Sequence, residues 1–245
     1  MKTLILIPAR MASSRFPNKP MALIKGKPMI QRVWEQAIAS DLGAVIVACC
    51  DPEVLKCIKS LGGRAIFTDP NLPSGTDRIY QALDKIDNSD QFDSIINLQG
   101  DMPIINPDDI SKVNKPLLQG FDIGTLVTDL KKNQIEDINV TKVQVNWIKK
   151  ETIGRAINFF KVSKATLNET YHHVGIYSFR YNVLKKFVSL SPSKNEIAHK
   201  LEQLRAIDAK MTVGVSYVKN VPISVDTKKD LILVESIMNQ NYEKN

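Results

Sequence analysis

The first half of the chain alternates between apolar runs of strand length and segments with helical spacing, and this alternation restricts the possible folds more than any other feature. Segment 28–41 carries apolar residues at three- and four-residue intervals, between the runs at 2–7 and 44–50. Such alternation predicts βαβ units, an α/β fold, and a mostly parallel sheet with helices on both faces. Ligands of such sheets bind beyond the carboxyl ends of the strands. Further strands are expected at 64–67, 93–101 and 121–130, and further helices at 51–63, 76–86 and 106–118.

The second half of the chain follows a different pattern. Segments 140–146, 154–162 and 171–180 are strand-like and have no helical segment between them, which predicts antiparallel strands that extend the sheet or form a flap. We therefore expect a single domain, residues 1–245, with a smaller lobe at approximately 130–215. Helices are expected near 181–188, 194–209 and 227–241, and a strand at 213–218.

Composition limits the class of protein. The length of 245 residues suits one α/β domain, and the net charge of +7 is compatible with nucleic acid, acidic lipid or phosphorylated small molecules as ligands. No apolar run reaches the roughly 18 residues of a membrane span, and the N-terminal apolar stretch is too short for a secretory signal. Cys49, Cys50 and Cys57 form neither a disulfide framework nor a spaced metal site, so we expect a reduced, cytoplasmic protein.

A basic segment follows the first expected strand. Arg10, Arg15 and Lys19 lie within ten residues of one another, in a stretch that prolines make stiff. Cations so close repel one another unless an anion joins them, and their hydrogen bonds to phosphate are about twice as strong as neutral ones. A solvated basic turn is the alternative. Because the spacing is that of neither a P-loop nor a dinucleotide-binding turn, the segment predicts an anion site of another kind.

Two aspartates are candidate metal ligands. Asp101 ends the apolar stretch 93–101, and Asp226 ends the stretch VPISV. Mg²⁺ is typically held by one or two carboxylates together with phosphate oxygens and water. Each aspartate could instead cap the helix that follows it. Because both are expected at strand ends beside an anion site, we expect them to converge on Mg²⁺.

Six segments occur together in the chain: IPARMASSRFPNKPMALIKGKPMI, SGTDR, NLQGDMP, HHVGIYSFR, LEQLR and VPISVDTKKDL. In this order and spacing they resemble the 3-deoxy-manno-octulosonate cytidylyltransferase family, whose members are also called CMP-KDO synthetases. The resemblance implies a Rossmann-like nucleotidyltransferase fold, a homodimer and Mg²⁺ as cofactor. It also implies transfer of CMP from CTP to 3-deoxy-manno-octulosonate (KDO), with release of pyrophosphate, for the inner core of lipopolysaccharide. It implies neither a nucleic-acid partner nor membrane insertion.

The resemblance assigns roles to individual residues. Catalytic roles fall on Arg10, Arg15, Lys19 and Asp101. Nucleotide binding falls on Arg10, Ser14, Arg15, Lys19, Ser74, Thr76 and Arg78. Metal binding falls on Asp101 and Asp226, and sugar binding falls on Gln99, Lys161, His173, Tyr177, Glu202 and Gln203. His173 alone would more simply be a structural histidine, but together with the other motifs we expect it in the site.

The chain departs from the family pattern in its sugar half. Met102 and His199 each stand where the family usually has Glu. Phe160 and Lys161 align with the Ser and Arg of a Phe-Ser-Arg segment, and lysine meets a carboxylate without the bidentate fork of arginine. Lys164 takes this role if the alignment slips. Two alternatives stay open: a cytidylyltransferase for amino-KDO or another 2-keto sugar acid, and a CTP-binding regulatory protein without turnover.

Overall fold

The structure, a computed structural model, describes residues 1–13, 15–162 and 169–242. Two compact units make up the chain. The first contains Met1–Phe92, Asn97–Ile110 and Pro222–Asn245, and the second contains Asp93–Ile96 and Ser111–Val221. The C-terminal segment therefore belongs to the same unit as the N-terminal half.

Parallel strands form the centre of the first unit, in the order β5-β4-β1. All seven residues of β1 are buried, which explains the unbroken apolar run near the N-terminus. Gly43 is required where β4 begins, because a Cβ there would lie 2.1 Å from the carbonyl oxygen of Thr3. The bounds are β1 (Thr3–Ala9), β4 (Gly43–Cys49) and β5 (Arg64–Phe67).

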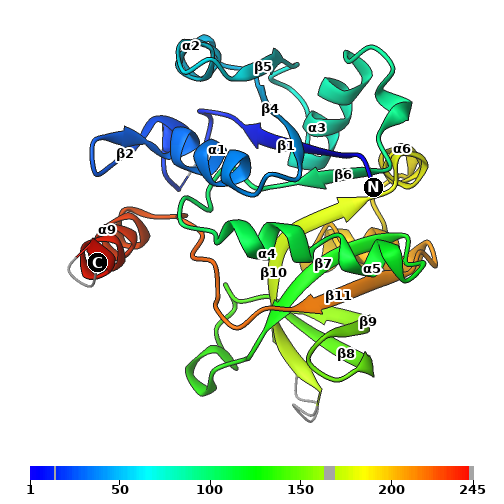
Figure 1. Ribbon diagram of the computed structural model, residues 1–245. Coiled ribbons are helices and arrows are strands. Elements are labelled where there is room, and N and C mark those ends of the chain that lie inside the picture. The colour runs from blue at the N-terminus through cyan, green and yellow to red at the C-terminus, as the bar shows by residue number, and fades with distance from the viewer. Residues whose placement is uncertain (14, 163–168, 243–245) are drawn as a thin grey trace. The chain divides into compact units, whose positions relative to one another are not determined.

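Helices α1 and α3 both pack on β1 and β4, and α2 packs on β4 and β5 (Figure 1). The helical spacing of the sequence places one apolar stripe of each helix against these strands; on α1 the stripe is Met29, Ile30, Val33 and Ala37. No helix within the described residues is long and apolar enough to cross a membrane. The bounds are α1 (Met29–Ala39), α2 (Pro52–Ser60), α3 (Gly75–Asp84), η2 (Ser89–Gln91) and α4 (Pro107–Lys112).

A short hairpin, which periodicity did not predict, follows the basic segment. Its strands are β2 (Leu23–Ile24) and β3 (Lys27–Pro28), preceded by the 3₁₀ turn η1 (Lys19–Met21). The chain reverses between the strands at Lys25 and Gly26, both with positive φ. The C-terminal helix α9 (Lys228–Tyr242) packs against β2 (Figure 1).

The strands of the second unit mix the two directions, in the order β6-β10-β7-β11-β9-β8 with a further pairing of β10 with β8. Strands β7 and β11 are parallel, whereas β10–β7, β10–β8, β9–β11 and β8–β9 are antiparallel. A register shift interrupts the β10–β7 pairing between Val174 and Tyr177. The bounds are β6 (Ser94–Asn97), β7 (Ile123–Thr128), β8 (Lys142–Lys149), β9 (Ile153–Phe160), β10 (Thr170–Phe179) and β11 (Val213–Tyr217).

The helix expected over 194–209 is two helices, α7 and α8. The first ends because Lys200 adopts a left-handed conformation, with φ of 53°. Arg205 then reaches back and forms a bidentate pair with the Glu196 carboxylate, at 2.6 and 2.8 Å, so the two helices are held together. The helices of this unit are α5 (Lys115–Leu118), η3 (Lys132–Gln134), α6 (Tyr181–Ser189), α7 (Lys194–His199) and α8 (Leu204–Asp208).

Two further expectations about strands were wrong. The strand expected over 93–101 ends at Asn97, so Asp101 lies in a turn beyond it. The stretch VPISV is not a strand. Pro222 has no N–H to donate to a ladder, and the Val225 N–H donates to the carbonyl oxygen of Asp101 at 2.8 Å.

Candidate active site

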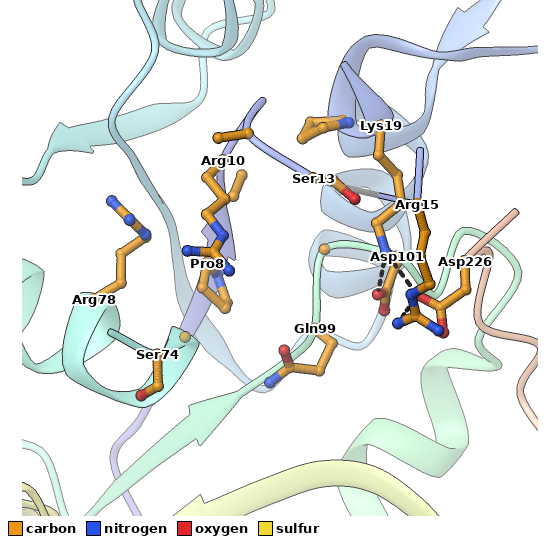
Figure 2. A pocket seen from close by; sticks show the side chains of 15 residues that line it. Pro8, Arg10, Ser13, Arg15, Lys19, Ser74, Arg78, Gln99, Asp101 and Asp226 are labelled. Atoms are coloured by element: carbon orange, nitrogen blue, oxygen red, sulfur yellow. Dashed lines mark hydrogen bonds and ion pairs between the residues drawn. The ribbon is translucent and has the colours of Figure 1, made fainter. Parts of the chain in front are cut away.

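One cavity of about 340 Å³ lies in the first unit, at the carboxyl end of β1. Three segments that are far apart in the sequence line it: the basic segment 8–20, the start of α3, and the turn 99–101. Asp226 completes the lining (Figure 2). The position follows the rule that parallel strands present their ligands at their carboxyl ends.

Lys19 joins the two predicted metal ligands. Its Nζ lies 2.7 Å from Asp101 Oδ2 and 3.1 Å from Asp226 Oδ1 (Figure 2). Arg15 Nη2 also donates to Asp226 Oδ1, at 3.1 Å. Burial by itself lowers the pKa of Lys19, but the charges and hydrogen bonds of Asp101 and Asp226 outweigh burial and raise that pKa above its usual value. The ammonium therefore stays charged between the two carboxylates.

The carboxylate of Asp226 does not cap the helix that follows it. Asp230, one turn into α9, accepts the N–H groups of Asp226 and Thr227 at 3.0 and 2.8 Å. Thr227 takes the cap position instead: its Oγ1 accepts the N–H of Asp230 at 3.4 Å while Asp230 accepts the N–H of Thr227, so the side chain of Asp226 is left to line the cavity. At α2 the residue in the cap position, Asp51, likewise makes no side-chain cap bond.

The basic segment is held by the bond that Asp51 makes instead. Asp51 Oδ2 accepts the N–H of Met11 at 2.8 Å, and the N–H of Asn18 donates to the carbonyl oxygen of Met11 at 3.1 Å. These bonds fix both ends of the turn that carries Arg15. Sequence reasoning missed this role of Asp51, because an aspartate directly before a proline at the start of a helix predicts a helix cap.

The start of α3 forms a second wall of the cavity. Ser74 caps the helix, and its Oγ accepts the N–H groups of Thr76 and Asp77, each at 3.1 Å. Arg78 is 2% exposed and donates to Thr68 Oγ1 and the carbonyl of Asp69. Its Nη2 has no hydrogen-bond partner within the part of the chain that the structure describes.

A chain of amides connects α3 to the turn of Asp101. Asn97 Nδ2 donates to Thr76 Oγ1 at 3.3 Å, and Gln99 Nε2 donates to Asn97 Oδ1 at 2.9 Å. Gln99 lines the cavity, whereas buried Thr76 lies behind the lining. Met102 is also buried and does not line the cavity, so this departure from the family pattern alters packing beside Asp101.

Most residues expected to bind the sugar belong to the second unit. His173 and Tyr177, both on β10, have ring centroids 5.5 Å apart, and His173 Nε2 lies 3.0 Å from Thr125 Oγ1. Burial lowers the pKa of His173 to about 3, so the imidazole is neutral near pH 7. Burial, and then the Glu202 carboxylate, raise the pKa of Tyr177. Gln203 is buried in the same unit.

Lys161 is half-buried at the end of β9, and its carbonyl oxygen accepts a hydrogen bond from Lys142 Nζ at 2.6 Å. Lys142 is 1% exposed, and the sequence pattern does not predict that this lysine is buried. Ser14 and Lys164 lie outside the described residues. Among the candidates, the cavity brings together Arg10, Arg15, Lys19, Ser74, Arg78, Gln99, Asp101 and Asp226.

The two carboxylates are candidate ligands for a Mg²⁺ ion. Because one ammonium touches both, their oxygens are no further apart than the sum of its two hydrogen bonds, and a cation already occupies the space between them. Within the described ranges no group of three or more His, Cys, Asp or Glu side chains could hold a metal ion. Two carboxylates that depend on phosphate oxygens and water to complete the shell are the usual donor set of Mg²⁺ in phosphoryl-transfer sites.

Parallel α/β strands, a cavity at their carboxyl ends, and cations paired with two carboxylates are features of enzymes that transfer phosphate-containing groups, and the comparisons place this chain among the nucleotidyltransferases. The family model of cytidylyltransferases matches residues 4–213. The 3-deoxy-manno-octulosonate cytidylyltransferase of Paramagnetospirillum magneticum is 42% identical over 231 residues, covering 93% of this chain and 94% of the relative. That of Brucella suis is 43% identical over 235 residues, covering 94% and 93%.

A solved structure of CMP:2-keto-3-deoxy-manno-octonic acid synthetase complexed with CTP superimposes with a TM-score of 0.88 at 34% identity. It covers 98% of this chain and 100% of its own. The expected α/β nucleotidyltransferase fold is thereby confirmed. The chain belongs to the 3-deoxy-manno-octulosonate cytidylyltransferase family.

Proposed function

We propose that the chain transfers CMP from CTP to KDO and releases pyrophosphate, with Mg²⁺ as cofactor. The observation that carries the proposal is the cavity, lined by Arg10, in which Arg15 and Lys19 pair with Asp101 and Asp226. The identity to relatives of that name over nearly the whole chain supports the choice of substrates.

CTP binding requires an exchange of partners in the cavity. Arg15 and Lys19 now neutralise Asp226 and Asp101, and a triphosphate would draw these cations to its own oxygens. The carboxylates would then be left to hold Mg²⁺, which when bound stabilises the negative charge that develops on the phosphate oxygens. Arg10, Ser74 and the unpartnered Nη2 of Arg78 supply further donors to the nucleotide.

In the reaction the anomeric oxygen of KDO forms a bond to the α-phosphorus of CTP, the bond from that phosphorus to the oxygen shared with the β-phosphorus breaks so that pyrophosphate leaves, and the hydroxyl proton passes to water. Lys19 and Arg15 balance the charge that gathers on the departing pyrophosphate. For the sugar we propose Gln99, Lys161, His173, Tyr177, Glu202 and Gln203. A neutral His173 and a neutral Tyr177 suit hydroxyl groups, and Lys161 suits the carboxylate.

We further propose that the protein acts as a homodimer in the cytoplasm and supplies CMP-KDO for the lipopolysaccharide inner core. The names of the relatives support the last part of this proposal.

Pyrophosphate release tests the function directly. CTP, UTP and ATP are each combined with KDO, an amino variant of KDO and N-acetylneuraminate, with Mg²⁺ present. We expect release above background only with CTP, and fastest with KDO. Faster release with the amino variant would move the assignment to that sugar acid, and no release with any pair would favour a CTP-binding protein without turnover.

A further inference from the structure

An apolar residue lies in the middle of the basic segment. Phe16 is 8% exposed, although its neighbours Arg15 and Pro17 are both exposed. Placing one aromatic ring in the interior fixes the backbone between the cations Arg15 and Lys19. A basic turn that only served as a solvated connection would have no reason to bury its central residue.

Phe16 packs in a cluster that also contains the residue before Asp226. The fully buried members are Ile24, Met29, Val225 and Val234, with Leu231 and Met238 of α9 packed against them. We call this set, with Phe16, the C-terminal cluster. The C-terminal cluster therefore holds both the turn that carries Arg15 and the segment that carries Asp226.

Backbone bonds extend the same connection to the other carboxylate. The N–H of Val225 donates to the carbonyl oxygen of Asp101 at 2.8 Å, so the backbones that carry Asp101 and Asp226 are joined directly. Glu235 of α9 accepts the N–H of Lys25, in the hairpin that follows the basic segment, at 2.9 Å. The helix is therefore attached to the hairpin that follows the basic segment, and it continues directly from the segment that carries Asp226.

We propose that α9 and Phe16 position the site: the C-terminal cluster holds Arg15 and Lys19 at the correct distance from Asp101 and Asp226. Val234, which lies outside the lining of the cavity, is then a positioning residue for CTP. Only the identity of the ligand rests on the proposed function. The physical reason is that charge-assisted contacts depend steeply on geometry, so a small shift of the cluster changes several of them at once.

The test compares two fully buried valines. Val234→Ala removes contacts in the C-terminal cluster, whereas Val215→Ala removes contacts in β11, in the second unit, and outside both the cluster and the cavity. The dissociation constant of CTP is measured calorimetrically with Mg²⁺ and without a sugar acid, so no turnover occurs. Thermal unfolding of each variant reports the loss of stability.

We expect Val234→Ala to weaken CTP binding by about tenfold or more. Val215→Ala should leave the dissociation constant within about twofold of the wild-type value at a similar fall in melting temperature. Phe16→Leu gives an independent reading if Val234→Ala does not fold, and it too should weaken CTP binding. Equal CTP affinity in the wild type, Val234→Ala and Phe16→Leu would overturn the inference. Wild-type protein that binds CTP but does not act on any sugar acid would overturn only the proposed function.

Discussion

Lys19 occupies the place that a metal ion would need. Its ammonium touches both Asp101 and Asp226, and each carboxylate is only partly exposed. At such distances the Coulomb attraction of one ion pair is about 5 to 6 kcal/mol for an effective dielectric constant of 20, before the cost of desolvation is subtracted. A divalent cation therefore competes with Lys19 until a triphosphate gives the lysine another partner.

Replacing Lys19 should consequently have opposite effects on metal and nucleotide. In the CTP-free protein, Lys19→Met is expected to tighten Mn²⁺ binding by about tenfold or more, since the competing cation is gone. The same variant should weaken CTP binding. Electron paramagnetic resonance of free Mn²⁺ measures the first effect and calorimetry the second. Lys25→Met, a lysine outside the cavity, should change neither. Unchanged Mn²⁺ affinity in Lys19→Met would contradict the competition.

The paired histidines of β10 make stability depend on pH. Burial lowers the pKa of His172 to about 4 and that of His173 to about 3, from a usual value of 6.5. At pH values between the lowered pKa of each histidine and its usual value, the unfolded state binds more protons than the folded state. The free energy of unfolding therefore falls as pH falls below 6.5. Each histidine can contribute up to about 1.4 kcal/mol per pH unit in that window.

His173→Gln should therefore flatten this pH dependence, measured by urea unfolding at pH values from 7 down to about 4.5. Carboxylates also lose stability in acid, so the comparison with a matched variant decides the result. His199 is exposed, and His199→Gln should keep the wild-type slope. Equal slopes in the wild type and both variants would show that His173 does not stay neutral in the folded protein.

The residue that caps α3 has both a structural role and a place in the cavity, whereas the residue that caps α7 has a structural role alone. Ser74 caps α3 with its hydroxyl oxygen, and the same residue lines the cavity. Ser193 caps α7 in the same manner, with an N–H contact from Glu196, and does not line the cavity. The pair therefore separates the structural effect of a cap from an effect on the ligand.

Ser74→Ala and Ser193→Ala should each cost about 1 kcal/mol of stability, the usual cost of a lost N-cap. Ser74→Asp should keep the cap, because aspartate is an equally good N-cap, but it loses the hydrogen bond that Ser74 Oγ donates to the Asp77 carboxylate and places two carboxylates together, so some stability should still be lost. It also places a negative charge beside the triphosphate, so CTP binding should fall by about tenfold or more. Chemical unfolding and CTP titration measure the two quantities. A Ser74→Asp variant that binds CTP normally would remove the start of α3 from the nucleotide site.

The periodicity of apolar residues predicted the helices and strands whose bounds depend on the local sequence. The strand at 64–67 has the expected bounds, and α3 and β10 each differ from expectation by one or two residues at their ends. The hairpin after η1 was missed because each of its strands has two residues, too few for a period. The break at Lys200 was missed because a lysine in the left-handed conformation lacks the Gly or Asn signal that usually marks the end of a helix.

At the scale of the whole molecule, sequence reasoning identified the charged groups of the cavity better than what holds them. The basic segment and Asp101 were visible because each follows an apolar run. The meeting of Asp101 with Asp226, 125 positions away, was expected from two strand ends that the structure does not contain and from the family resemblance, and the structure shows both carboxylates on Lys19. Asp51 contacts Met11, and Lys142 contacts the carbonyl oxygen of Lys161. Each partner lies far away along the chain, so no local pattern predicts these contacts.

The two units hold different groups of the proposed residues. The first contains the cations and both carboxylates, and the second contains all the sugar candidates except Gln99. Variants of the first group should therefore affect CTP binding and turnover, and variants of the second should affect the sugar alone. Lys161→Ala is expected to raise the Michaelis constant for KDO and leave that for CTP nearly unchanged, in steady-state assays of pyrophosphate release. A rise for CTP alone would contradict this division.

Phosphorus NMR of the complete reaction follows CTP, pyrophosphate and the sugar ester in one measurement. With CTP, KDO and Mg²⁺, we expect pyrophosphate and a single CMP ester of the sugar to form in equal amounts as CTP disappears. Asp101→Asn should fold normally and be slower by about a thousandfold, while Asp84→Asn, on the exposed end of α3, should match the wild type. Conversion of CTP to CDP and phosphate, or pyrophosphate release that does not require KDO, would contradict the account.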